Sequence, residues 1–266
     1  MVQLLDLMGF VPSTSRTTVP SLGTELIDTL VEFLNTIIIP GRIPEAVRPA
    51  FYGAKLMALS KPCGGIRPIA IGGTPRRLAG KIVMSKLQDS IRSTFQPHQL
   101  GVGTRKGSEI AVHVLRKYLQ CESGDKVVLK IDYRNAFNCI RRDKFLTKVR
   151  ELFPDVYPMV WQAYSSESNL YFNGHTLLST NGVHQGDPIG PFLFSLGILD
   201  IMKECQSEVS LWYLDGTLAG DPETVLNDFQ RLIESSKSIG LEVNLGKCEL
   251  FFTKSGGNEA AAMSSN

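Results

Sequence analysis

The chain lacks the long apolar runs that mark membrane proteins. No stretch of about 18 apolar residues occurs, which excludes an ordinary membrane-spanning helix. The N-terminus has neither the basic segment nor the apolar core of a secretory signal peptide. We therefore expect an intracellular protein, in the cytoplasm or the nucleus, with no membrane partner.

Paired cysteines and clustered histidines are also missing. None of the five cysteines belongs to a Cys-x-x-Cys pair, so the ligand spacing of a zinc site is absent. An odd number of scattered cysteines predicts free thiols in a reducing compartment, mostly buried as small hydrophobic residues. The four histidines form no ligand pattern either.

Acidic residues are scarce in one part of the chain. Between Arg42 and Lys117 the sequence has 14 basic residues and 3 acidic ones, although the net charge of the whole chain is only +2. A basic front half followed by a more acidic back half suits a polyanion held near a metal site. Ordinary solvated surface explains the same distribution, so charge alone does not decide.

The chain does contain enough apolar residues, 43% of the total, for a sizeable core. From residue 127 onward, strand, helix and hairpin patterns alternate, which predicts an α+β fold with helices on one face of an antiparallel sheet. Helices are expected at 24–39, 77–95, 107–120, 143–153, 158–166, 189–204 and 222–239. Strands and hairpins are expected at 56–71, 127–132, 170–178, 241–244 and 248–252. Asp221 is expected to cap the last helix.

Two apolar strands each end in a carboxylate. The first runs into Asp132, and the second runs into Asp215, where Asp215-Gly216 predicts a tight turn. Two such carboxylates can hold divalent cations between them, because Mg²⁺ prefers oxygen ligands and keeps several waters. Asp-Gly is also an ideal two-residue turn, so a plain turn role for Asp215 stays open.

Several motifs, in order, resemble the reverse transcriptase domain of non-LTR retrotransposons. They are LSKPCGGIRPIAI (59–71), RRLAGK (76–81), QLGVGTRKGSEIAVH (99–113), KIDYRNAF (130–137), NGVHQGDPIGPFLF (181–194), WYLDGTLAGD (212–221) and GLEVNLGKCELFF (240–252). The resemblance implies a right-hand polymerase fold with fingers and an antiparallel palm sheet backed by helices. The implied divisions are an N-terminal helical extension (1–52), a fingers-like part (53–125), a palm-like part (126–252) and a disordered tail (253–266).

The resemblance also implies roles for individual residues. Asp132 and Asp215 would be catalytic and would bind Mg²⁺ or Mn²⁺. Lys61 and Arg67 would contact the triphosphate of the incoming nucleotide, and Arg is suited to bidentate phosphate contacts. Gln185 and Gly186 would contact the incoming nucleotide and the template base.

Further residues have a structural interpretation beside the functional one. Phe137 would exclude a 2′-hydroxyl on the incoming sugar, or it packs in the core. Lys247 would donate a proton near the pyrophosphate, or it is surface charge. Tyr213 would support the primer end, or it is core. Arg76 and Arg77 would contact the template, or they lie on a solvated helix face.

The hairpin motif is one residue short. The family pattern is Tyr-x-Asp-Asp, whereas the order here is Tyr213-Leu214-Asp215-Gly216, as if one aspartate were deleted. The loss removes a carboxylate from the metal site. A one-residue slip would also turn the returning strand to its other face, unless a bulge or a reshaped turn absorbs it.

The implied activity is RNA-directed DNA synthesis, with an RNA template, a DNA primer and deoxynucleoside triphosphates as partners. The sequence ends just after the closing motif, so we expect a truncated domain without a thumb, an endonuclease or an RNase H region. Together with the short hairpin, this predicts impaired or absent catalysis. The alternative is a non-catalytic, nucleic-acid-binding remnant of a retrotransposon.

Overall fold

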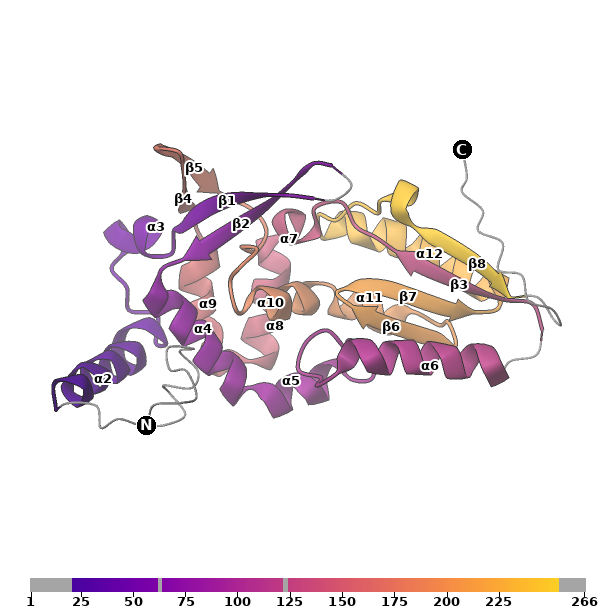
Figure 1. Cartoon of the computed structure of the whole chain (residues 1–266), viewed down its shortest axis with the longest axis horizontal. Coiled ribbons are helices and arrows are strands. Elements are labelled where there is room, and N and C mark those ends of the chain that lie inside the picture. The colour runs from indigo at the N-terminus through magenta and orange to yellow at the C-terminus, as the bar shows by residue number, and fades with distance from the viewer. Residues whose placement is uncertain (1–20, 62–63, 122–123, 254–266) are drawn as a thin grey trace. The chain divides into compact units, whose positions relative to one another are not determined.

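The structure is a computed structural model that describes residues 21–61, 64–121 and 124–253 (Figure 1). The chain forms two compact units, and each is assembled from two separate stretches of sequence. None of the helices in the described ranges combines the length and the apolar composition that crossing a lipid bilayer requires. Residues 254–266 of the predicted tail and Cys63 lie outside the described residues, whereas Thr253 belongs to a strand.

The first unit comprises Met1–Leu87 and Phe145–Gly190. Its four-stranded sheet has the order β2-β1-β4-β5, in which only the β1–β4 pair is parallel. The strands are β1 (Ala54–Ser60), β2 (Ile66–Gly72), β4 (Ser168–Phe172) and β5 (His175–Ser179). The helical segments are α2 (Ser21–Phe33), η1 (Leu34–Ile38), η2 (Glu45–Val47), α3 (Arg48–Phe51), α4 (Thr74–Lys86), η3 (Pro154–Val156) and α9 (Tyr157–Tyr164). The helix α8 (Arg142–Leu152) runs across a boundary between the two units.

Both hairpins of this sheet follow from local sequence. Asn173 and Gly174 join β4 to β5 with φ values of 47° and 78°. Two consecutive positive φ angles are the geometry that an Asn-Gly pair favours in a two-residue hairpin turn. The β1–β2 hairpin at 54–72 confirms the hairpin expected at 56–71.

The second unit comprises Gln88–Lys144 and Pro191–Asn266. Its sheet is antiparallel throughout, with the order β6-β7-β3-β8. The strands are β3 (Lys126–Ile131), β6 (Val209–Tyr213), β7 (Asp215–Gly220) and β8 (Glu249–Thr253). The helical segments are α5 (Gln88–Phe95), α6 (Gly107–Cys121), α7 (Ala136–Cys139), α10 (Gly190–Gly197), α11 (Leu199–Glu204), α12 (Pro222–Ser238) and η4 (Leu245–Lys247).

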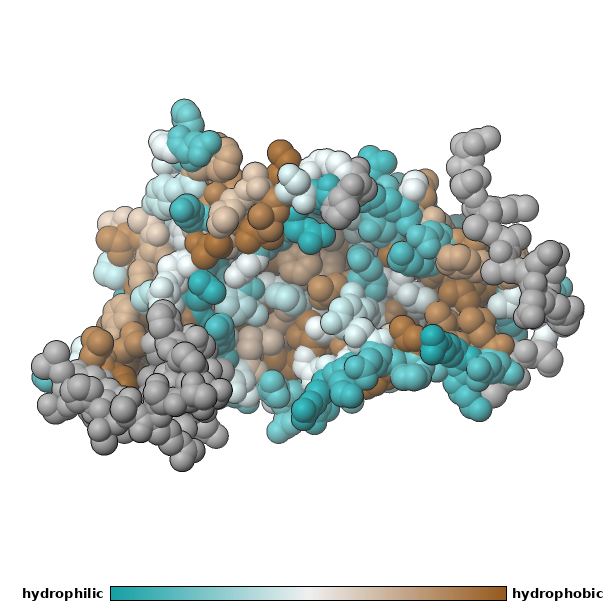
Figure 2. All heavy atoms as spheres, viewed as in Figure 1, coloured by the Kyte–Doolittle hydropathy of each residue, from teal (hydrophilic) through white to brown (hydrophobic). Residues whose placement is uncertain are grey.

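Helices pack on both faces of this second sheet, so the prediction of helices on one face was wrong. On one face, Leu115 and Tyr118 of α6 pack on a buried cluster of Val128, Val209 and Ala219. The outer side of α6 is hydrophilic (Figure 2). On the other face, α12 contacts β3 and β7. Because side chains alternate along a strand, the face that carries Val128 and Ala219 also carries Lys130 of β3 and Asp215 of β7.

Two helices that the sequence predicted as continuous are broken. The helix expected at 77–95 is interrupted at Leu87, where the chain passes from the first unit to the second. The helix expected at 189–204 is interrupted at Ile198, which has φ −99° and ψ 4°. The preceding Gly197 is a poor helix former, and this favours the break.

Other local predictions were wrong. Residues 241–244 form no strand. Val243 makes an isolated bridge with Tyr133, and backbone hydrogen bonds join Glu242 to Arg134 and Asn244 to Asp132. Asp221 stands at the N-cap position of α12 but makes no side-chain cap bond, because its carboxylate accepts a hydrogen bond from Lys126 Nζ at 3.0 Å. Cys139 is exposed rather than buried, at the end of the short helix α7.

Candidate functional site

The hairpin that carries Asp215 turns on a single residue. Leu214 alone joins β6 to β7, and its φ is 69°. Tyr213 pairs directly with Asp215 across the hairpin. The predicted Asp215-Gly216 turn is therefore wrong, because Asp215 is the first residue of β7 and Gly216 is the second.

The missing residue is absorbed entirely in this turn. The strand β7 pairs without interruption with β3, from Ile131 opposite Gly216 to Val127 opposite Gly220. It also pairs without interruption with β6. A regular register keeps every side chain of the returning strand on its own face. Of the two remedies that the sequence left open, the reshaped turn is present, and the pairing has no bulge.

Asp132 and Asp215 lie beside each other. Asp132 directly follows Ile131, which pairs with Gly216, so one further step of the antiparallel register brings Asp132 opposite Asp215. Partial desolvation and the charge of Asp132 raise the pKa of Asp215 to about 6, while Lys130 acts in the opposite direction. Asp215 keeps an exposed surface, so solvent still reaches this carboxylate. The two acids thus form a coupled and accessible pair.

Asn244 orients Asp132, and sequence reasoning missed it. Its side-chain Nδ2 donates to Asp132 Oδ2 at 3.1 Å, and its backbone N–H donates to the Asp132 carbonyl oxygen at 2.8 Å. Burial, and then the nearby charges of Asp132 and Asp215, raise the pKa of the Cys248 thiol, although a hydrogen bond with the Asp132 backbone acts to lower it. The position of Asn244 in the closing motif was its only sequence signal.

The other predicted site residues of the second unit are Phe137, Tyr213 and Lys247, and they differ in how far they are buried. Phe137 is partly buried and stacks on Phe194 of α10, with ring centroids 5.0 Å apart and planes 11° apart. Tyr213 is 50% exposed, so it is not a core residue. Lys247 is exposed at the end of η4, three residues beyond Asn244.

The predicted nucleotide contacts of the first unit lie on two adjoining segments. Lys61 and Arg67 belong to the β1–β2 hairpin, where Arg67 is exposed. Ala70 of β2 donates its N–H to the carbonyl oxygen of Gln185 at 2.7 Å. Gly186 has φ 114°, and a Cβ there would lie 2.8 Å from the Ala70 oxygen, so only glycine allows this close approach.

A buried ion pair fixes the segment that contains Gln185. Arg76 is 6% exposed, and its guanidinium donates to Asp187 Oδ2 at 2.6 Å. Tyr164 Oη donates to the same oxygen at 2.7 Å. Burial acts to raise the pKa of Asp187, but Arg76 and this hydrogen bond hold the pKa below its ordinary value. Both proposed roles for Arg76 were wrong, whereas Arg77 is exposed as a solvated helix face requires.

The carboxylate pair is the best metal-binding candidate. Within residues 21–61, 64–121 and 124–253, no group of three or more His, Cys, Asp or Glu side chains is arranged to hold a metal ion. Two adjacent, accessible carboxylates still fit a Mg²⁺ ion that keeps several waters. Burial first, and then repulsion from Asp132, raise the pKa of Asp215, and a bound cation would relieve that repulsion.

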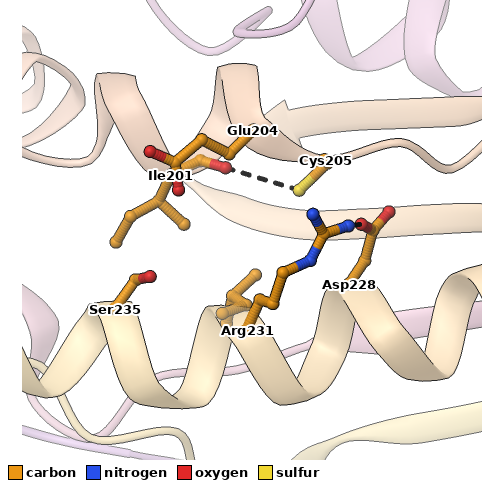
Figure 3. Close-up of a pocket in the computed structure, with 7 residues that line it drawn as sticks. Ile201, Glu204, Cys205, Asp228, Arg231 and Ser235 are labelled. Carbon is orange, nitrogen blue, oxygen red and sulfur yellow. Dashed lines mark hydrogen bonds and ion pairs between the residues drawn. The ribbon is translucent and has the colours of Figure 1, made fainter.

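A shallow depression lies between α11 and α12 (Figure 3). Its lining includes Cys205, Asp228 and Arg231 but neither member of the carboxylate pair. The buried Asp228 accepts the backbone N–H groups of Gln206 and Ser207 at 2.8 and 2.7 Å, and it also pairs with Arg231. The polar groups that line this depression bind one another. We therefore interpret the hydrogen bonds of Asp228 as structural, because they hold the loop after α11.

The chain is similar to known proteins over most of its length. Residues 59–259 match the family described as reverse transcriptase (RNA-dependent DNA polymerase). The retrotransposable element SLACS 132 kDa protein of Trypanosoma brucei gambiense is 29% identical over 227 residues, which cover 80% of this chain and 19% of that protein. A probable RNA-directed DNA polymerase from transposon BS of Drosophila melanogaster is 27% identical over 145 residues, which cover 51% and 16%. The chain thus spans less than a fifth of either relative.

Solved telomerase structures share the fold. A Candida albicans telomerase in complex with a fragment of telomeric RNA has a TM-score of 0.59 and 12% identity, over 86% of this chain and 47% of that one. A Candida tropicalis apo telomerase truncated from its C-terminal domain has a TM-score of 0.57 and 13% identity, over 79% and 52%. The predicted α+β polymerase fold and the resemblance to non-LTR reverse transcriptases are confirmed.

Proposed function

Because the chain belongs to the reverse transcriptase (RNA-dependent DNA polymerase) family, we propose that it is an RNA-directed DNA polymerase domain of a non-LTR retrotransposon with weakened catalysis. The observation that carries this proposal is the register that brings Asp132 opposite Asp215 despite the shortened hairpin. Weakening follows because the hairpin supplies one carboxylate, where the family pattern has two.

Asp132 and Asp215 would hold Mg²⁺ or Mn²⁺ in this proposal, because both ions prefer oxygen ligands. When bound, divalent ions activate the attacking primer hydroxyl and stabilise charge on the leaving group. Asn244 orients the Asp132 carboxylate through a hydrogen bond from its side-chain amide, and its backbone N–H holds the Asp132 carbonyl oxygen. An outer group of this kind tunes metal affinity without touching the ion.

The remaining residues bind the substrates. Lys61 and Arg67 contact the triphosphate, and Gln185 and Gly186 contact the incoming nucleotide and the template base. The bond from Ala70 to Gln185 ties the segment with Gln185 to the strand with Arg67, which supports a shared role in nucleotide binding.

Residues of the second unit contact the sugar of the incoming nucleotide and the end of the primer. Phe137 excludes a 2′-hydroxyl, and its stacking on Phe194 supports this role because it restrains the ring. Tyr213 supports the primer end from its exposed position beside Asp215. Lys247 donates a proton to the leaving pyrophosphate. Residues 53–125 would act as fingers and residues 126–252 as palm.

The template is RNA in this proposal. The family match, and the binding of a telomeric RNA fragment by the telomerase that shares this fold, support an RNA partner. The excess of basic residues between Arg42 and Lys117 also supports binding of a polyanion.

Primer extension on a primed RNA template with Mg²⁺ or Mn²⁺ tests the proposal. We expect weak extension by the natural chain, no extension by Asp132→Ala, and stronger extension when one Asp is inserted beside Asp215. The second candidate, a non-catalytic nucleic-acid-binding remnant, is favoured by the low number of carboxylates. Salt-sensitive binding of template–primer without extension, by the natural chain and the insertion variant alike, would establish that candidate instead.

A further inference from the structure

A short segment, residues 98–101, runs beside the catalytic hairpin, and we call it the strap. Trp212 of β6 donates its N–H to the His98 oxygen at 2.8 Å, and Leu100 donates its N–H to the Trp212 oxygen at 2.7 Å. Gln99 forms an isolated parallel bridge with Trp212. The strap therefore extends the sheet by a single β-bridge at the outer edge of β6, next to the turn at Leu214.

The side chain of Gln99 continues this pairing beyond the end of β6. Gln99 is fully buried, and its Oε1 accepts the N–H of Leu214 at 3.2 Å and the N–H of Gly101 at 2.8 Å. Its Nε2 lies 3.8 Å from the sulfur of Met202. An amide oxygen has two lone pairs, and here both are used.

The turn needs this support because its backbone is strained. A leucine at φ 69° is unfavourable by roughly 1–2 kcal/mol, and Leu214 is the whole turn. The absence of a side chain at Gly101 lets the strap lie close to the turn. A Cβ at this position would lie 3.0 Å from Gln99 Oε1 and 3.3 Å from the Leu214 nitrogen. The strap and the shortened turn thus fit each other at van der Waals distance.

We propose that Gln99 is a positioning residue, which holds the one-residue turn through the Leu214 N–H and so keeps Asp215 opposite Asp132. The inference rests on the proposed function in one respect, namely that the two carboxylates bind a divalent cation. It adds a role for a residue that touches neither the cation nor the nucleotide. It also explains how a hairpin that has lost a residue keeps its remaining aspartate in place.

Hydrogen exchange of the unaltered chain tests the hydrogen bond itself. The Leu214 amide should exchange at least about 100-fold more slowly than the amide of Gly174. Gly174 is the comparison because it is a turn residue in open surroundings, where an added Cβ would meet no atom within 4 Å. Equal exchange at the two turns would overturn the proposal. This measurement needs no variant, so it decides even if substitutions at Gln99 prevent folding.

Manganese binding tests the positioning role. Gln99→Met keeps the size of the side chain but removes the acceptor, and we expect Mn²⁺ affinity, measured by electron paramagnetic resonance, to fall about tenfold. The matched control is Gln162→Met in the first unit. Gln162 is likewise buried, and its amide bonds both the N–H and the carbonyl of Ile43 at 3.1 Å.

The two variants separate positioning from general stability. Unchanged Mn²⁺ affinity in Gln162→Met, beside the loss in Gln99→Met, supports the proposal. An equal loss in both variants, or no loss in either, overturns it. If the unaltered chain binds no Mn²⁺, the proposed function fails, whereas the exchange of Leu214 still decides whether Gln99 holds the turn.

Discussion

Trp212 lies directly over Gly216 across the β6–β7 hairpin, and a Cβ on Gly216 would come within 3.0 Å of the indole ring. Trp212 is fully buried, so the ring has little freedom to move away. This contact fixes which residue of β7 stands opposite Trp212, and hence where Asp215 lies. We infer that the pair sets the register of the hairpin.

Gly216→Ala should therefore destabilise the fold by about 1–3 kcal/mol through overpacking against Trp212. Urea unfolding measures the change. Gly220→Ala on the same strand is the control, because the atoms nearest its Cβ would be 3.3 and 3.5 Å away, and it should lose less than about 1 kcal/mol. Equal losses at the two glycines would contradict the register role of Trp212.

Insertion of one Asp between Leu214 and Asp215 should raise Mg²⁺ affinity. The inserted residue is expected in the turn, since the contact of Trp212 with Gly216 keeps the following strand in register. A two-residue turn also relieves the strain at Leu214, and the site gains a carboxylate. Calorimetric titration with Mg²⁺ measures the affinity, and insertion of one Asn is the control. Equal affinity in the natural, Asp-inserted and Asn-inserted chains would sink this explanation of the short motif.

Asp215→Asn should stabilise the folded chain at neutral and higher pH. Since the pKa of Asp215 is raised to about 6, the folded state favours the protonated acid, and this contribution is lost as the pH rises from about 4 through 6. Asp215 is exposed, so after allowance for solvent screening the gain at pH 8 is on the order of 1 kcal/mol. Urea unfolding at pH 4 and pH 8 should show the gain only at pH 8.

The control for this titration is Asp221→Asn. Asp221 accepts a hydrogen bond from Lys126 Nζ. Loss of the Asp221 charge should therefore lower the stability of the fold slightly rather than raise it. A gain for Asp215→Asn of the same size at both pH values would show that the raised pKa of Asp215 is not its cause.

Arg76→Met should destabilise the chain by roughly 3–5 kcal/mol, because it leaves the buried Asp187 without its cation. Arg77→Met is the neighbouring control on an exposed position, and it should change stability by less than about 0.5 kcal/mol. The double variant Arg76→Met/Asp187→Asn should recover part of the loss, since it removes the uncompensated charge. Thermal or urea unfolding measures the stability of each variant. Equal losses in Arg76→Met and Arg77→Met would contradict a stabilising role for the buried ion pair of Arg76 and Asp187.

Local chemistry made much of the structure predictable. Asn173-Gly174 predicted its hairpin because few residue pairs adopt positive φ at both turn positions. The proximity of Asp132 and Asp215 was predictable because each follows an apolar strand. The order of strand, helix and hairpin patterns likewise indicated an antiparallel sheet backed by helices.

The errors arose where distant residues override local preference. Asp215-Gly216 is a favourable turn sequence, but the indole of Trp212 needs a glycine inside the strand, so the turn moves to Leu214. Arg76 was assigned to the surface because its partner, Asp187, is 111 residues away. Asn244 was missed for the same reason, since its partner Asp132 is 112 residues away.

The most direct test of the account is a Mn²⁺ titration of the natural chain, followed through the ¹³C-labelled carboxyl groups of its aspartates. Paramagnetic broadening should affect Asp132 and Asp215 together, at the same low Mn²⁺ concentration and before other carboxyl groups such as Asp221. Asn substitution at either site assigns the two signals and should abolish the early broadening of the other. Broadening of only one of the pair, or of neither, would contradict a shared cation site at the shortened hairpin.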